Sequence, residues 1–359
     1  MSMCKTKVLI IQEELSHYNV PCFNILSECY DLTFIYTTKA KNENAKFKTI
    51  HETIKTVGPF AFFDNGINNI IKGYDVVICG PYLKYLNILL KTFGKKNVIY
   101  YGIGLTASYK NGFDTKKHLT YLLSRYVKSI GAAVFYTQYA KDRYVGLGIN
   151  PKKLFVANNT VEVLEHEKKD KDILLFVGTL YKEKGVFELI DEYIEAFKIN
   201  SNIADLFIVG DGDEKESLIK YVNDSLIVRN KIKFLGAIFE EKKLKELFER
   251  SIACISPNQA GLTVLKSMGY GVPFITKENA ITGGEILNIT NGSTGILYKR
   301  NVELRKIILD TYLNYSSFLQ MGKEAEKYYN DKCTVKNQAN GFIEAIEFVK
   351  KKCWILKMR

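Results

Sequence analysis

The sequence predicts an α/β protein of two domains, each built on a parallel sheet with helices on both faces. Short apolar runs rich in β-branched residues alternate with segments of helical spacing along the chain, a pattern typical of parallel sheets. The charged stretch Glu165–Asp172 interrupts this alternation and is typical of a linker. The length of 359 residues also fits about two domains.

In the first half, the apolar runs that predict strands are Val8–Ile11, Leu32–Tyr36, Val76–Cys79, Val98–Tyr101, Val134–Tyr136 and Leu154–Val156. The segments that predict helices are Val20–Cys29, Tyr82–Phe93 and Lys116–Ile130. Asp114 or Thr115 is expected to cap the last helix, because short polar side chains accept hydrogen bonds from the free N–H groups of a first turn. We assign residues 1–165 to this first, Rossmann-like domain.

After the linker, about five parallel strands are expected, at Ile173–Val177, Leu206–Val209, Lys231–Leu235, Ala253–Ser256 and Val272–Ile275. The expected helices are Val186–Phe197, Glu214–Val222, Lys242–Arg250 and Thr263–Tyr270, with two more at roughly 303–330 and 337–351. We assign residues 166–335 to a second Rossmann-like domain, and residues 336–359 to a C-terminal helix and basic tail that can pack back on the first. Parallel α/β folds bind ligands at domain interfaces and strand carboxyl ends, so we expect the site in a cleft between the domains.

The positive charge is concentrated in the first domain. The formal net charge is +12; residues 1–165 hold 21 Lys+Arg against 12 Asp+Glu, whereas the remaining residues hold 30 against 27. This charge favours an anionic partner, such as a phosphorylated substrate or an anionic membrane surface, or it serves solubility alone. No nucleic-acid recognition motif is present, so nucleic acid is not an expected partner.

The seven cysteines contain no C-x-x-C pair, which argues against a disulfide framework or a zinc ribbon. No apolar stretch reaches the roughly 18 residues of a membrane span, and the first apolar run is too short for a signal peptide. We therefore expect a cytoplasmic protein that can lie at the inner face of the cell membrane.

A candidate phosphate-binding loop follows the first strand of the second domain. In Leu174–Gly185, LLFVGTLYKEKG, the strand runs into Gly178, and a loop with Lys182 and Lys184 leads to the next helix. Glycine lets a backbone approach a phosphate, and lysines and a helix N-terminus favour its charge. The Gly-Lys-Ser/Thr of a Walker A loop is absent, and an ordinary turn with solvated lysines is the alternative.

Three further segments contain glycine turns: Leu206–Gly212 (LFIVGDG), Ile232–Gly236 (IKFLG) and Cys254–Ile275 (CISPNQAGLTVLKSMGYGVPFI). In the last of them, a strand ends at Ser256 and a loop precedes a helix that starts near Thr263. Backbone N–H groups are unpaired at the start of a helix, so those of residues 261–263 suit a diphosphate.

These four segments, in this order, resemble the nucleotide-binding half of the family 4 retaining glycosyltransferases, which have the GT-B fold of two Rossmann-like domains facing a cleft. The family pattern is G-R-L-x-x-x-K-G, V-G-x-G, F-x-G and P-S-x-x-E-G-F-G-L-x-x-x-E-A-M-x-x-G-x-P-V-I. Here it reads GTLYKEKG, VGDG, FLG and SPNQAGLTVLKSMGYGVPFI, as in a divergent member. The resemblance covers about residues 173–298 and implies donor-binding positions at Gly178, Gly210, Gly236, Gly261, Leu262 and Thr263.

This chain departs from the family at three positions. The family's first phosphate-binding arginine falls on Thr179, and its two glutamates, which contact the donor sugar and the ribose, fall on Asn258 and Lys266. The second cation, Lys184, is retained, with Lys182 beside it. Asn258 can still hydrogen-bond a sugar hydroxyl. Lys266 cannot accept a hydrogen bond, and we expect it to take over part of the diphosphate clamp; a solvated lysine is the alternative.

Three other sites carry weaker signals. Glu285, in the loop AITGGEI, is a candidate to reach the donor sugar or ribose, although a glutamate at a helix N-terminus has the same pattern. His17, after the first strand, is a candidate to orient an acceptor hydroxyl, although a lone histidine is more often structural. Asp211–Asp213 matches D-x-D, the metal motif of another glycosyltransferase fold, but it lies in the VGDG turn, so we expect turn chemistry and no metal.

The resemblance implies a metal-independent hexosyltransferase that moves a sugar from a nucleotide-diphosphate sugar to a hydroxyl of a glycan or lipid-linked oligosaccharide. The anomeric configuration would be retained, and no cofactor besides the donor would be needed. Surface polysaccharide biosynthesis, of lipopolysaccharide or capsule, is the expected role. Loss of the arginine and of both glutamates leaves two alternatives open: a catalytically inactive binding or scaffold subunit, and a sugar-nucleotide isomerase or hydrolase.

Overall fold

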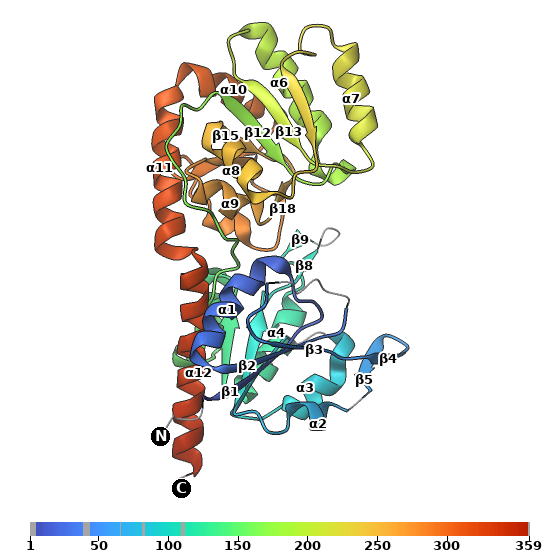
Figure 1. The fold of residues 1–359 in the computed structure, drawn as a ribbon, viewed down its shortest axis with the longest axis vertical. Coiled ribbons are helices and arrows are strands. Elements are labelled where there is room, and N and C mark those ends of the chain that lie inside the picture. Colours follow the sequence, from blue (N-terminus) through green and yellow to red (C-terminus); the bar gives the residue numbers. More distant parts are fainter. Residues whose placement is uncertain (1–4, 39–43, 65, 81–82, 109–111, 358–359) are drawn as a thin grey trace. The chain divides into compact units, whose positions relative to one another are not determined.

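The computed structural model describes residues 5–38, 44–64, 66–80, 83–108 and 112–357, which form two compact units (Figure 1). The first unit contains residues 1–107, 114–161 and 334–359, and the second contains residues 108–113 and 162–333. The chain therefore changes unit at 107/108, at 113/114, at 161/162 and at 333/334. Residues 358 and 359 of the expected basic tail lie outside the described residues.

The sheet of the first unit has seven parallel strands in the order β11-β10-β7-β6-β1-β2-β3. Their bounds are β1 Lys7–Ile11, β2 Asp31–Tyr36, β3 Lys48–His51, β6 Val76–Cys79, β7 Val98–Gly102, β10 Ala132–Phe135 and β11 Leu154–Val156. Apart from β3, these are the strands that the apolar runs predict. The interior strand β1 is buried from Val8 to Ile11, as expected for a strand with helices on both faces.

Helices cover both faces of this sheet. On one face, α1 (Val20–Cys29) and α12 (Val335–Lys357) share a core with β1, and Phe23 of α1 packs against Phe342 of α12. On the other face, Tyr126 of α4 (Lys117–Ser129) reaches Cys79 of β6, whose neighbour Ile78 belongs to the first core. The remaining helices are η1 His17–Asn19, α2 Ile67–Ile71, η2 Leu83–Tyr85, α3 Leu86–Thr92, α5 Gln138–Gly146 and η3 Pro151–Lys153.

The first unit differs from the sequence prediction in its small elements. The strand β3 and the antiparallel hairpin of β4 (Ile54–Val57) and β5 (Phe60–Phe63) were not predicted, because half or more of the residues in β3 and β4 are polar. The predicted helix 82–93 is η2 followed by α3, and Tyr82 lies outside the described residues.

The predicted cap of α4 was wrong. The helix follows Lys116, and neither Asp114 nor Thr115 caps it. Asp114 instead adopts φ 52°, is buried, and forms an ion pair with Arg143 (3.1 Å) while Tyr139 OH donates to it (2.9 Å). A buried carboxylate needs such partners, and this need outweighs the preference for capping.

The sheet of the second unit has six parallel strands in the order β14-β13-β12-β15-β17-β19. Their bounds are β12 Ile173–Val177, β13 Asp205–Val209, β14 Ile232–Gly236, β15 Ser251–Ile255, β17 Phe274–Lys277 and β19 Gly295–Tyr298. Five were predicted, and β19 extends the sheet beyond β17. Two short pairs complete the strands: β8 (Ala107–Ser108) with β9 (Gly112–Phe113), and β16 (Gln259–Ala260) with β18 (Ile281–Thr282).

The helices of the second unit are η4 Lys182–Lys184, α6 Val186–Ile199, α7 Lys215–Asp224, α8 Glu241–Arg250, α9 Thr263–Gly269, η5 Glu285–Asn288, α10 Asn301–Leu313 and α11 Tyr315–Lys332. The predicted helix at 303–330 is divided at Asn314, whose backbone (φ −120°, ψ 36°) leaves the helical region. Among the described residues of the chain, no helix combines the length and apolar composition needed to cross a bilayer.

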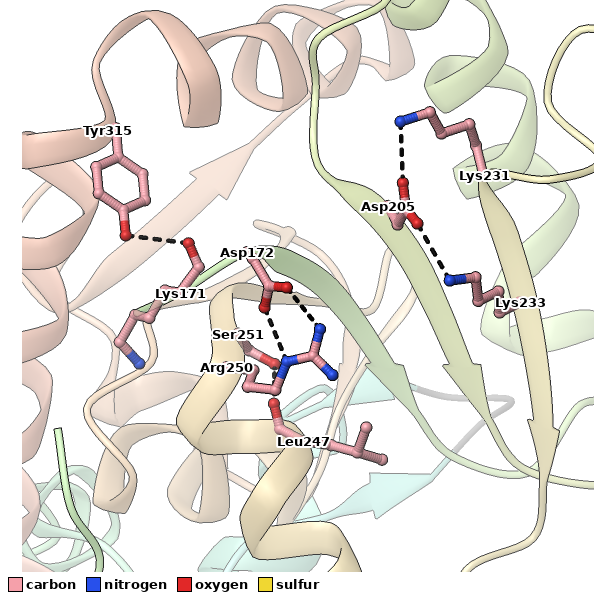
Figure 2. Close-up of polar contacts among 9 residues, drawn as sticks. All are labelled: Lys171, Asp172, Asp205, Lys231, Lys233, Leu247, Arg250, Ser251 and Tyr315. Atoms are coloured by element: carbon pink, nitrogen blue, oxygen red, sulfur yellow. Dashed lines mark hydrogen bonds and ion pairs between the residues drawn. The ribbon is translucent and has the colours of Figure 1, made fainter. Parts of the chain in front are cut away.

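Paired charges lie at the amino edge of the second sheet (Figure 2). Arg250, at the end of α8, donates to both carboxylate oxygens of Asp172 at 2.9 and 2.5 Å. Asp205, the first residue of β13, lies between Lys231 (3.1 Å) and Lys233 (3.3 Å). Each of these three cations has a carboxylate partner, and pairs exposed to this extent contribute little to stability.

Candidate functional site

Three glycine turns meet at the carboxyl edge of the second sheet. Gly178 follows β12, Gly210 follows β13, and Gly236 ends β14. The N–H of Gly178 donates to Val209 O (3.0 Å) and that of Gly210 to Gly236 O (2.9 Å), so each turn is tied to the next. A Cβ on Gly210 would lie 1.9 Å from Gly178 O, so this close approach requires glycine. The structure therefore brings three of the sequence-predicted glycines together.

Lys184 lies over the first of these turns. It ends η4, and Gly185, in the left-handed region at φ 72°, turns the chain into α6. The ammonium Nζ lies 3.2 Å from the position of a Cβ on Gly178 and 5.7 Å from the ring centroid of Tyr181. Within the part of the chain that the structure describes, neither a carboxylate nor a hydrogen-bond acceptor pairs with this ammonium.

Burial lowers the pKa of Lys184 to about 8, because removal of water disfavours the charged ammonium. The thiol of Cys254, on β15, has a smaller effect and raises the pKa of Lys184. Lys171, before β12, also has its pKa lowered to about 8 by burial, but there the carboxylates of Glu326 and Glu249 oppose the shift. Lys184 has no carboxylate in that role, so a bound anion would stabilise its charge.

Asn258 packs directly against the Lys184 turn. Its Nδ2 lies 2.4 Å from the position of a Cβ on Gly185, and its backbone N–H donates to Lys184 O at 3.4 Å. The N–H of Ile281 donates to Asn258 O at 2.8 Å and joins the next loop. The two positions that the family resemblance assigns to phosphate and to donor sugar, Lys184 and Asn258, are therefore neighbours.

The loop after β15 leads through β16 to Gly261 and Leu262, and α9 begins at Thr263. Because Ala260 pairs with Thr282 of β18, the turn that contains Glu285 lies beside Gly261. The Glu285 carboxylate accepts from Gly283 N (2.9 Å) and Thr282 Oγ1 (3.3 Å), and the residue is 8% exposed. Glu285 thus stabilises its own turn, and a role toward the donor stays a prediction.

Lys266 was expected in the diphosphate clamp, but it lies in a different environment from Lys184. Its ammonium forms an ion pair with Glu241 in the first turn of α8, and the Lys266 side chain is 14% exposed. A cation that already has a carboxylate partner gains less from an added phosphate than one that has none. Lys184 is therefore an unpaired cation as far as the structure describes the chain, whereas Lys266 is a paired one.

The other predicted residues are placed as follows. Thr179 and Lys182 lie in the Lys184 turn, and both are exposed. Asp211 accepts from Lys215 (2.9 Å) and from Gly212 N (2.8 Å), which is the turn chemistry expected for VGDG. His17 lies in the first unit, exposed, at the carboxyl end of β1, and its role toward an acceptor stays a prediction. In the described ranges, no group of three His, Cys, Asp or Glu side chains is arranged to hold a metal ion.

Two further features of the second unit were not predicted. Tyr181 OH donates to Gln259 Oε1 (2.7 Å) and links the loops after β12 and β15. A groove of about 530 Å³ runs between α8 and the end of β14, and Phe239 on its rim is 90% exposed. The Tyr181–Gln259 contact joins residues 78 positions apart, and the groove depends on how α8 packs, so a single sequence predicts neither of them.

Comparison with known proteins places these features in a family context. Residues 160–328 match the model of the Glycosyl transferases group 1. Alpha-monoglucosyldiacylglycerol synthase of Acholeplasma laidlawii is 24% identical over 187 residues, which is 50% of this chain and 46% of the synthase, so the alignment spans about half of that relative. The uncharacterized glycosyltransferase MJ1069 of Methanocaldococcus jannaschii is 26% identical over 283 residues, 71% of this chain and 69% of that protein.

Among solved structures, Anabaena Alr3699/HepE in complex with UDP superposes with a TM-score of 0.69 at 13% identity, covering 95% of this chain and 100% of that one. At this identity the likeness establishes the fold alone. With the two open parallel sheets, these matches show that the chain has the GT-B fold of glycosyltransferases and that its residues 160–328 carry the glycosyl transferases group 1 pattern.

Proposed function

We propose that the chain is a glycosyltransferase that holds the diphosphate of a nucleotide sugar at the carboxyl edge of the second sheet. The observation that carries this proposal is Lys184, a partly buried ammonium beside Gly178 with a pKa lowered to about 8. A phosphate about 4 Å from an ammonium gains about 4 kcal/mol at an effective dielectric of about 20. Because Lys184 already lies in a partly dehydrated site, little of this gain is lost to further desolvation.

The same groups would act on the transfer step. The bond between the anomeric carbon and the phosphate oxygen breaks, and the electron pair leaves with the diphosphate. Lys184 and the N–H groups of Gly261–Thr263 stabilise the growing negative charge, which is where fixed donors act most strongly. The acceptor hydroxyl bonds to the anomeric carbon on the face the diphosphate leaves, and its proton passes to the departing phosphate. The configuration is retained without a protein nucleophile or a divalent ion.

Relatives support the choice of donor. Alr3699/HepE has been solved in complex with UDP and with UDP-glucose, and Staphylococcus aureus TarM with UDP and alpha-GlcNAc-glycerol. We therefore take a UDP-hexose as the donor of this chain. The acceptor we propose is a hydroxyl of a glycan or lipid-linked oligosaccharide in surface polysaccharide biosynthesis, which suits the basic first unit.

The first test is calorimetric titration with UDP-glucose and UDP-N-acetylglucosamine. Wild type should bind at least one of them, Lys184→Ala should lose about tenfold or more in affinity, and Lys182→Ala, which removes an exposed lysine two residues away, should lose much less. Absence of binding to any nucleotide sugar, or an unchanged Lys184→Ala protein, would refute the proposed site.

The second test follows release of UDP in the presence of a metal chelator, with and without a pool of glycan and lipid-linked acceptors. Release only with acceptor identifies a transferase, and release without acceptor identifies a hydrolase. Binding without release identifies a donor-binding subunit that lacks catalysis. This last function is the second candidate, because Lys266, at the position implied for a ribose-binding carboxylate, is a cation paired with Glu241.

A further inference from the structure

An exposed apolar surface lies on the first unit. Leu90 of α3 is 68% exposed, Phe93 just beyond α3 is 60% exposed, and Tyr121 and Leu122 of α4 are 51% and 62% exposed. Isolated exposed apolar side chains are common on proteins, but a cluster of four large ones on neighbouring helices usually marks a binding surface.

The two helices adjoin at their C-terminal ends. Thr92, the last residue of α3, lies 2.7 Å from Tyr126 OH of α4, and Gly94 N donates to Ser129 Oγ at 3.2 Å. The chain crosses from β6 to β7 through α3 and from β7 to β10 through α4, so right-handed crossovers place both helices on the same face of the sheet. Their outward sides therefore form one surface, which we call the α3–α4 face.

The α3–α4 face carries positive charge without acidic residues. Residues 86–97 and 117–129 contain six Lys and Arg and no Asp or Glu. All six are exposed: Lys91, Lys95, Lys96, Lys117, Arg125 and Lys128. Within the described ranges, no carboxylate forms an ion pair with any of them, whereas exposed lysines of the second unit such as Lys243 and Lys327 have carboxylate partners.

We propose that the α3–α4 face docks the protein on an anionic lipid bilayer. Leucine, phenylalanine and tyrosine side chains enter the boundary between headgroups and acyl chains, and lysines and arginines around them contact anionic headgroups. Stable binding needs both apolar insertion and electrostatic attraction, because a few apolar side chains or a few charges alone give only weak, reversible binding. A carboxylate on this face would be repelled by the same headgroups, which accounts for the absence of Asp and Glu in these two segments.

The composition favours a bilayer over a nucleic acid or an acidic protein. Leu90 and Leu122 offer no hydrogen bond to a phosphate backbone. Leu90 adjoins Lys91 in the sequence, and Leu122 is three positions before Arg125 on α4, so apolar and basic side chains alternate in both segments. An anionic bilayer therefore binds both the cations and the exposed apolar side chains of the α3–α4 face.

Vesicle flotation tests this proposal with the full chain. Wild type should float with vesicles of phosphatidylcholine and phosphatidylglycerol, remain below those of phosphatidylcholine alone, and be released by high salt. Leu122→Glu and the double variant Arg125→Gln/Lys128→Gln should each lower the partition coefficient, the latter by about fivefold per charge. The matched controls are Leu313→Glu, at a site 64% exposed in the second unit, and Lys306→Gln, both expected to bind like wild type.

Three results would overturn the proposal: equal binding to neutral and anionic vesicles, wild-type binding by both face variants, or equal losses in the controls. Transfer of the protein from anionic vesicles to an equal charge of soluble RNA or polyglutamate would also overturn it, in favour of a polyanion partner. Circular dichroism of each variant excludes unfolding as the cause of a loss. The assay contains neither donor nor acceptor, so its outcome is separate from that of the transferase assay.

Discussion

The side-chain amide of Asn258 fills the space beside the Cα of Gly185. A Cβ on Gly185 would lie 2.4 Å from Asn258 Nδ2 and 2.9 Å from its Cγ. Real Cβ atoms essentially never approach another atom this closely, so a side chain at residue 185 must displace Asn258 or the turn. The contact joins the loops after β12 and β15, and it sets Asn258 beside the cation Lys184.

We expect Gly185→Ala to weaken donor binding by about tenfold, because displacing Asn258 costs on the order of 1 kcal/mol or more at the site. The control is Gly292→Ala, which has a similar backbone (φ 76° against 72°) but nothing within 4 Å of the new Cβ. Both variants should lose about 1 kcal/mol of unfolding free energy from backbone strain in urea titrations. Equal donor affinity in the two variants, measured by calorimetry, would contradict a role for the Asn258 contact.

Lys184→Met should stabilise the empty protein while removing donor binding. The pKa of Lys184 is lowered to about 8 in the folded chain, whereas an unfolded lysine has its ordinary value of 10.5. Below about pH 8 both states are protonated and the folded state bears the full cost of the buried charge, about 1–3 kcal/mol. Above about pH 8 the folded protein loses its proton first, so the advantage of methionine shrinks. Urea unfolding at several pH values measures this difference, and a destabilised methionine variant would argue against an uncompensated charge.

Donor affinity should fall as pH rises above about 8. Bound diphosphate raises the pKa of Lys184, so binding of UDP-glucose takes up a proton where the empty site has lost it. We expect an increase in Kd of up to about tenfold between about pH 8 and about pH 9. Lys184→Arg remains charged throughout this range, so its affinity should be independent of pH even if it is weaker. A matching pH dependence in the arginine variant would assign the titration to another group.

The fold could be predicted where burial leaves a continuous apolar run. Val76–Cys79 is buried at every position and forms β6 with the predicted bounds. In β19, two of four residues are only half-buried, and the run GILY follows a glycine-containing loop, so it does not stand out. The division of the predicted helix at Asn314 carries no glycine or proline signal, so the sequence pattern continues across it.

The order of the motifs in the sequence was enough to predict part of the candidate site. Lys184 and Asn258 were identified because four glycine turns occur in register, and parallel strands bring their carboxyl ends to one edge. The ion pair between Lys266 and Glu241 was not predicted, because the two residues are 25 positions apart and lie on different helices. The low pKa of Lys184 depends on how the side chain is buried, and a sequence contains no such information.

Lys266 forms an ion pair with Glu241. Replacing each residue in turn therefore tests whether Lys266 stays paired or binds the diphosphate. We expect Lys266→Ala to change the affinity for UDP-glucose by less than about twofold, since the Glu241 side chain is 49% exposed and stays solvated when its partner is lost. Glu241→Gln should instead free the ammonium and strengthen donor binding severalfold, because an unpaired cation on α9 attracts the diphosphate. Lys245→Ala, which breaks a similar pair with Glu249 on α8, is the matched control and should leave donor affinity unchanged. A loss of tenfold or more in Lys266→Ala, with Glu241→Gln unchanged, would show that Lys266 leaves Glu241 for the diphosphate in the bound state.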